Sequence, residues 1–320
     1  MRRFALRAVV SVALSGCLLI ALFRLASPRA VGDLLVHARP GNLAAGFGLY
    51  ALGCLARARR LRLIGLRVPL RALMAIGCVH QALNRLLPLR TGELSYPWLA
   101  RRIGGQGFGQ AMIGLAYLRV LDLAAVAVLF AVTLDLGRRS FLGDPRLGLV
   151  GSALLLAGAV AILVWLLPLL RLCVDVGERL LGPRRLLQRA RATVDGFPRL
   201  DGGAHLRLAA LSVAGWLFIY GTFAVLMAGF GKWLGLTRTI LGATASVIAS
   251  VQPIQGVGSF GTLEAGWALG MSLVGLDRGA AVATGVGVQL FTFAYAAILG
   301  VWGWLVLARR APRDGLGVPG

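Results

Sequence analysis

Charged residues are scarce in this sequence of 320 residues, where Asp, Glu, Lys and Arg together make up 14%. An ordinary globular domain contains about 25%. Acidic residues are the scarcest, because 12 Asp and Glu stand against 34 Lys and Arg. So few charges do not suit a water-soluble surface, whereas 58% hydrophobic residues suit a lipid solvent. The composition therefore predicts an integral membrane protein.

Features that soluble functions require are also missing. The four cysteines are scattered without C-x-x-C spacing, so we expect no disulfide framework, no metal site and no cofactor. The longest segment between apolar runs, residues 171–207, is shorter than the roughly 50 residues of a minimal domain. The chain has no D-x-D, Walker or H-E-x-x-H motif, so we expect no enzyme, with lipid modification as the weaker hypothesis. The net charge is +22, but the basic residues lie between apolar spans. This pattern does not indicate nucleic acid binding, which requires a basic face on a soluble fold.

Apolar runs of membrane-spanning length recur along the chain. A helix needs about 20 residues to cross a hydrocarbon core of about 30 Å. We predict six full transmembrane helices, over residues 8–25, 42–56, 111–134, 147–170, 208–230 and 280–308. Two further apolar stretches, residues 72–100 and 240–276, are interrupted by Pro, Gly and ionisable residues. The sequence thus predicts an all-α integral membrane protein with a single polytopic membrane domain over residues 1–320.

The distribution of basic residues predicts the topology. With the amino terminus inside, 22 of the 34 basic residues fall on the cytoplasmic side and nine on the outer side, as the positive-inside rule requires. Both termini, the tail 309–320 and the loop 171–207 are then cytoplasmic. This count works only if each interrupted stretch enters and leaves on one side, so we predict two re-entrant hairpins of broken helices. The halves, 1–137 and 145–310, would form an inverted repeat; the alternative is two full helices kinked by Pro and Gly.

Three acidic residues are placed at membrane depth, where an unpaired charge costs several kcal/mol. Arg119 and Asp122 lie three residues apart on one helical face, which suits either an ion pair or a functional site. Glu93 and Glu264 each lie shortly after a glycine, near the expected start of a half-helix. A carboxylate there either stabilises the helix amino end or binds a cationic group.

Polar side chains in the two hairpins face a hydrated cavity or each other, because lipid tails cannot solvate them. Arg85 and Arg90 could bind a lipid phosphate, although Arg90 could equally extend to the headgroup layer. The glycine-rich run from Gly256 to Gly261 has no preceding strand, which excludes a dinucleotide site, but its free N–H groups could bind an anion. The predicted substrate-binding residues are Asn84, Arg85, Pro88, Arg90, Gly92, Glu93, Arg119, Asp122, Gln252, Pro253, Gly256, Gly258, Gly261 and Glu264.

Residues 84–93 (NRLLPLRTGE) and 253–266 (PIQGVGSFGTLEAG) resemble the two signature segments of the lysylphosphatidylglycerol synthase transmembrane family. Arg119 and Asp122 resemble its mid-chain motif, with the departure that Leu118 stands where the family often has Glu. The resemblance extends over nearly the whole chain. It implies a flippase-like protein of the bacterial cytoplasmic membrane that translocates a charged or glycosylated lipid between leaflets.

Two functions therefore stay open. The first is lipid translocation, with a membrane phospholipid or polyprenyl-linked lipid as substrate. In it, Glu93 and Glu264 bind cationic parts of the headgroup and the arginines bind phosphate. The second is a non-transporting membrane partner of a lipid synthase or glycosyltransferase. Small-residue spacings such as Gly266 with Gly270 favour such close helix packing.

Overall fold

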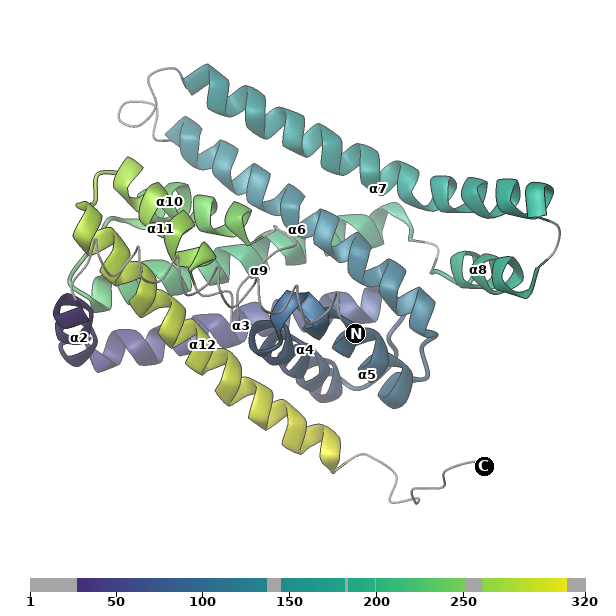
Figure 1. Cartoon of the computed structure of the whole chain (residues 1–320), viewed down its shortest axis with the longest axis horizontal. Coiled ribbons are helices and arrows are strands. Elements are labelled where there is room, and N and C mark those ends of the chain that lie inside the picture. Colours follow the sequence, from purple (N-terminus) through teal and green to yellow (C-terminus); the bar gives the residue numbers. More distant parts are fainter. Residues whose placement is uncertain (1–27, 137–144, 182–183, 199, 251–260, 310–320) are drawn as a thin grey trace, which may run out of the picture.

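The structure is a computed structural model that describes residues 28–136, 145–181, 184–198, 200–250 and 261–309 (Figure 1). The described residues form helices and no strand. The α-helices are α2 (Pro28–Val36), α3 (Pro40–Leu63), α4 (Leu70–Leu86), α5 (Ser95–Gly104), α6 (Phe108–Leu136), α7 (Pro145–Leu181), α8 (Arg185–Asp195), α9 (Gly202–Gly229), α10 (Leu236–Ala249), α11 (Thr262–Leu273) and α12 (Arg278–Ala308). A 3₁₀ helix, η1 (Pro88–Leu94), lies between α4 and α5.

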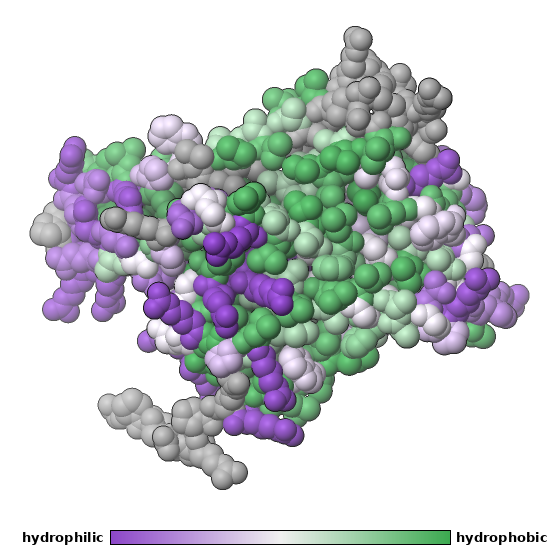
Figure 2. Space-filling view, turned by 180° about the vertical axis from the view of Figure 1, so that it is seen from behind, coloured by the Kyte–Doolittle hydropathy of each residue, from purple (hydrophilic) through white to green (hydrophobic). Residues whose placement is uncertain are grey.

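The surface and the long helices are those of a membrane protein. In the described part of the chain, Phe108–Leu134, Gly202–Gly229 and Arg278–Ala308 are long and apolar enough to cross a bilayer. They match three of the predicted spans. Figure 2 shows a broad hydrophobic band between hydrophilic residues at the right edge and others along the left and lower edges. The predicted all-α membrane class is confirmed, whereas the number of spans stays a prediction.

Two of the other three predicted spans lie within helices of the structure. Residues 42–56 lie within α3 and residues 147–170 within α7, while residues 8–25 lie outside the described residues. Much of the segment 171–207, predicted as a loop, is helical, because α7 continues to Leu181 and is followed by α8. Arg191 of α8 contacts Asp175 and Glu178 of α7, which holds the two helices together.

The first interrupted stretch is a pair of short helices. Pro88 ends α4, because proline lacks an N–H and forces the preceding residue, here Leu87, into extended backbone (φ −85°, ψ 132°). The chain reverses through η1, so that α5 begins beside α4. The Nδ1 atom of His80 on α4 lies 3.0 Å from the Oγ atom of Ser95 at the start of α5.

The second interrupted stretch has the same form. The Oγ atom of Ser246 on α10 donates a hydrogen bond of 2.8 Å to the carbonyl of Leu263 on α11. Further along, Gly270 lies so close to the backbone of Gly242 that a Cβ atom at residue 270 would collide with it. Both interrupted stretches are therefore paired short helices, and their entry into a membrane from one side stays a prediction.

Helices of the two halves correspond in order and length. The pairs are α3 with α9 (24 and 28 residues), α4 with α10 (17 and 14), α5 with α11 (10 and 12) and α6 with α12 (29 and 31). Equivalent contacts also recur, since α4 packs on α12 and α10 packs on α6, while α3 and α9 pack on each other. An inverted repeat predicts this pattern, although the opposite orientation of the halves in a membrane stays a prediction.

Candidate functional site

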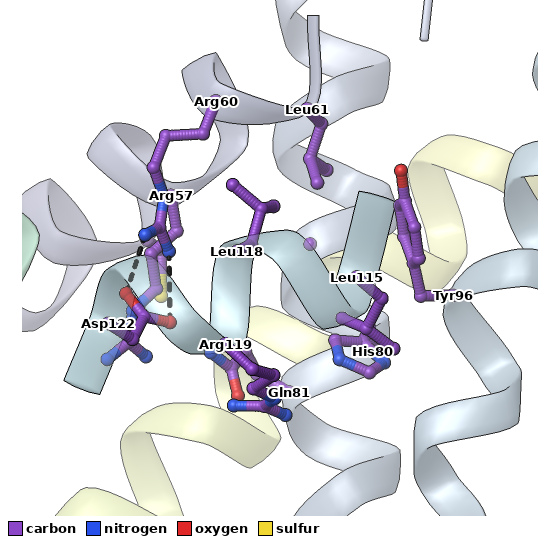
Figure 3. Close-up of a pocket in the computed structure, with 12 residues that line it drawn as sticks. Arg57, Arg60, Leu61, His80, Gln81, Tyr96, Leu115, Leu118, Arg119 and Asp122 are labelled. Atoms are coloured by element: carbon purple, nitrogen blue, oxygen red, sulfur yellow. Dashed lines mark hydrogen bonds and ion pairs between the residues drawn. The ribbon is translucent and has the colours of Figure 1, made fainter. Parts of the chain in front are cut away.

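Two cavities lie among the helices that surround the hairpins. The first, of about 50 Å³, lies among α3, α4, α5 and α6 (Figure 3). Its lining residues are Cys54, Arg57, Arg60, Leu61, Gly77, His80, Gln81, Tyr96, Leu115, Leu118, Arg119 and Asp122. The lining contains three arginines and one aspartate among mostly apolar side chains. Ionisable side chains are rare and costly in the interior of a membrane protein, so their presence here indicates a functional site.

The second cavity, of about 120 Å³, lies where α4 meets helices of the second half. Its lining residues are Arg57, Arg85, Trp216, Ile219, Phe223, Ser246, Val247, Ser250, Leu263, Trp267, Gly285, Val288, Gln289 and Thr292. These residues include two guanidinium groups, three hydroxyls and one amide, but no carboxylate. Arg57 belongs to the lining of both cavities.

A polar network connects α3, α6 and α9 next to the first cavity. Arg60 Nη1 donates to Asp122 Oδ1 at 2.5 Å (Figure 3). The same atom donates to Ser212 Oγ at 2.7 Å. Trp216 Nε1 donates to the same Asp122 oxygen at 3.3 Å. Because Arg60 and Asp122 are both shielded from solvent, each neutralises a charge that would otherwise be costly to bury.

Arg57 and Arg85 are held differently from Arg60. The guanidinium carbon of Arg57 lies over the Trp216 ring, 5.3 Å from its centre, which is a cation–π contact. Arg85 Nη1 donates a hydrogen bond of 3.2 Å to Thr292 Oγ1. Among the described residues, no carboxylate lies within 4 Å of either guanidinium group. Both therefore present positive charge to the second cavity.

The structure assigns Arg119 and Asp122 to partners other than each other. Asp122 pairs with Arg60, whereas Arg119 Nη2 lies 3.2 Å from Glu93 Oε1. The i, i+3 ion pair that the sequence offered is therefore not the arrangement found. The physical reason is that α3 and η1 bring opposite charges to α6 in better positions than its own neighbouring turn does.

The two predicted carboxylates have different surroundings. Glu264 is 1% exposed, and its Oε2 atom accepts a hydrogen bond of 2.7 Å from the N–H of Gly261 at the start of α11. Gly261 has φ +89°, a conformation that glycine adopts without strain. Glu264 thus stabilises the amino end of α11, which is the capping alternative. Glu93 is in η1, before α5 begins. Its Oε1 atom accepts a hydrogen bond from Arg119 Nη2.

The remaining predicted residues divide between the two hairpins. Gly92 is buried against the backbone of Leu83 and Asn84, where a Cβ atom would collide, so glycine is needed for the reversal at η1. Asn84 lies in the last turn of α4, and Pro88 and Arg90 lie in η1. The predicted residues outside the described part of the chain are Gln252, Pro253, Gly256 and Gly258.

Sequence reasoning missed Arg57 and Arg60, which it counted with the basic residues of a cytoplasmic loop. Both residues lie on a helix, because α3 continues to Leu63, and Arg60 is only 3% exposed. The side of the membrane on which they lie stays a prediction. A signal was present in their spacing. Arg57 and Arg60 are three residues apart and share one helical face, while Arg59 points outward. Trp216, which holds both the Arg57 ring contact and the Asp122 hydrogen bond, was also missed.

The fold and these cavities define a polytopic, all-α membrane protein with cationic groups in its interior. The family profile of the lysylphosphatidylglycerol synthase TM region matches residues 8–300. The chain belongs to that family, as the resemblance of its two signature segments implied. No curated protein matches the chain closely enough to count as a relative.

Proposed function

We propose that this protein is a flippase-like translocase, which moves a lipid with a charged or glycosylated headgroup between the leaflets of the bacterial cytoplasmic membrane. The observation that carries the proposal is the second cavity, where Arg57 and Arg85 present positive charge inside a bundle whose surface has a broad hydrophobic band (Figure 2). A headgroup in this cavity would replace its lost hydration with charged and hydroxyl groups. Its acyl chains could stay in the surrounding lipid.

The residue chemistry suits a phosphate-bearing headgroup. Guanidinium groups form strong, charge-assisted hydrogen bonds with phosphate oxygens. Arg85 already donates to the hydroxyl of Thr292, and Ser246 and Ser250 add two more hydroxyls to the same wall. Trp267 is fixed by a hydrogen bond of 3.2 Å from its Nε1 atom to Thr284, so its ring forms a stable wall of the cavity. The hydroxyls of Ser246 and Ser250 already donate to the carbonyls of Leu263 and Val247, so phosphate binding falls mainly to the two guanidinium groups.

The proposal gives the carboxylates a supporting role. Glu264 is engaged with the start of α11 and Glu93 with Arg119. Neither carboxylate lines the second cavity. We therefore assign phosphate binding to the arginines. We assign to Glu264 no role in binding a cationic part of the headgroup. No catalytic step is proposed, and the role of non-transporting partner of a lipid synthase or glycosyltransferase is the alternative.

The test is movement of fluorescent phospholipids between leaflets in proteoliposomes. We expect Arg85→Gln to reduce the rate at least several-fold, because one charge-assisted contact contributes about 1.5 to 3 kcal/mol. Arg59→Gln is the matched control, since Arg59 is an exposed arginine on α3 that lines neither cavity. Thermal unfolding in detergent should be nearly the same for both variants. A parent protein that moves no phospholipid or polyprenyl-linked lipid would favour the partner role instead.

A further inference from the structure

Arg57 lies between the two cavities, and of the described residues it is the one found in both linings. The cavities follow one another along α4. Gly77, His80 and Gln81 line the first, while Arg85, one turn further along, lines the second. A group that leaves one cavity for the other along α4 therefore passes the guanidinium of Arg57.

The charges around the two cavities do not balance. Among the described residues, four arginines line the cavities, namely Arg57, Arg60, Arg85 and Arg119. Asp122 neutralises Arg60, and Glu93 neutralises Arg119. Arg57 and Arg85 are left as two excess positive charges, because no described carboxylate lies within 4 Å of them. Excess charge inside a membrane protein is costly unless a bound anion compensates it.

The position of Arg57 is set by a neighbour that belongs to the same network. Its guanidinium lies over the Trp216 ring, and the Trp216 N–H is bonded to Asp122, which is itself paired with Arg60. Arg57 donates no hydrogen bond to another described residue beside this contact, so its N–H groups can donate to an anion. Arg57 is thus anchored but keeps donors for an incoming anion.

We propose that Arg57 is a contact shared by two successive sites for one phosphate group, and that it makes the protein select lipids whose headgroup has a net negative charge. This inference rests on the proposed function and specifies the substrate class of the same site. A phosphate bound by Arg57 and Arg85 in the second cavity keeps its Arg57 contact as it enters the first. Zwitterionic headgroups bring a cation that the excess positive charge repels.

The test is equilibrium binding to the purified full-length protein in a non-ionic detergent, measured by calorimetry. The probes are dihexanoyl phosphatidylglycerol, with one net negative charge, and dihexanoyl phosphatidylcholine, with none. We expect the anionic lipid to bind the parent protein at least about tenfold more tightly, because the choline cation of the other lipid is repelled by the excess positive charge. Arg57→Gln should weaken this preference at least several-fold, Arg57→Lys should weaken it less, and Arg59→Gln should leave it unchanged.

Each outcome decides the inference. Equal affinity of the parent protein for both lipids would overturn it, and so would an undiminished preference in Arg57→Gln. The first comparison needs no variant, so a variant that fails to fold does not prevent a decision. Glycerol 3-phosphate that binds as tightly as the anionic lipid would show a site for a soluble phosphate ester and overturn the lipid assignment. Arg57-dependent binding without transport in proteoliposomes would support this inference and contradict the proposed function.

Discussion

Arg60 on α3 and Asp122 on α6 form an ion pair of 2.5 Å between residues 62 positions apart, with side chains only 4% and 14% exposed. The pair links the two helices beside the first cavity. Through the Trp216 hydrogen bond to Asp122, it also determines where the ring under Arg57 lies. The stability of the helix bundle and the shape of the cavities therefore depend on the same two charges.

Loss of one partner of this pair should be strongly destabilising. Asp122→Ala leaves Arg60 buried without its carboxylate, and we expect a loss of about 3 to 5 kcal/mol. Asp195→Ala is the control, because the Arg171–Asp195 pair is about half exposed and such pairs contribute only about 0 to 1 kcal/mol. Unfolding in detergent measures both. The double variant Arg60→Met, Asp122→Leu should recover much of the loss, and a tolerated Asp122→Ala would contradict the structure.

Glu264 and Glu93 should respond differently to replacement by glutamine. Glu264→Gln keeps an oxygen for the Gly261 N–H, so we expect a change of only about 0.3 to 1 kcal/mol and near-normal lipid movement. Glu93→Gln removes the negative charge beside Arg119 and should not weaken the binding of an anionic lipid. Transport and thermal stability are measured together for both variants and the double variant. A several-fold loss of transport at unchanged stability in both would restore the cationic-headgroup role.

The close contact between α10 and α11 should not tolerate a larger residue. A Cβ atom at residue 270 would meet the carbonyl of Gly242, so Gly270→Ala must push the helices apart. We expect a cost of about 1 to 3 kcal/mol, as for overpacked cores. Gly158→Ala on α7 is the control, because a Cβ atom there has open space and alanine favours the helix. Equal stability of the two variants would show that the hairpin arms are not in contact.

The predicted membrane topology has two direct tests. A reporter fused after Leu307 should be active only on the cytoplasmic side, because that arrangement places 22 basic residues inside. Single cysteines at Thr91 and Ser259, in a background without other cysteines, should react with impermeant thiol reagents from opposite sides. Reaction of both from one side would rule out the inverted repeat, even with the matching helix lengths.

The start of α12 should make a small, pH-dependent contribution to stability. The backbone N–H groups of Ala280 and Gly279 hold the pKa of Asp277 below its usual range. A lowered pKa stabilises the folded state above the unfolded value of about 3.9, and this stabilisation is lost as the pH falls through the folded pKa. Asp277→Ala should therefore lower the unfolding temperature at pH 7 and have progressively less effect below about pH 4. Asp33→Ala, at an exposed acid on α2, is the control.

Several elements could be predicted from local pattern because their causes are local. The spans of α6, α9 and α12 follow from uninterrupted apolar runs, and the break after α4 follows from Pro88. The need for Gly92 at the reversal was not predicted, because its close approach to the backbone of Leu83 and Asn84 appears only in the folded chain. Charge bias in short loops is an equally local signal, which is why a topology could be stated at all.

The partners of charged residues could not be predicted in the same way. Asp122 has a neighbouring arginine, Arg119, on its own helix. Only the packing of α3 against the bundle shows that Asp122 pairs with Arg60 instead. Arg57 and Arg60 looked like loop residues because a basic run near a span end is usually cytoplasmic. Their inward orientation depends on where α3 ends and which face it turns to α9.

The sequence by itself determined the solvent of this protein, its helical class and its family, because composition, run length and signature segments are properties of the chain alone. Tertiary structure decided which arginines are neutralised and which are not. That distinction requires distances between α3, α4, α6 and η1, which no linear spacing contains. The excess charge of Arg57 and Arg85, on which the proposed function rests, is therefore a property of helix packing and not of composition.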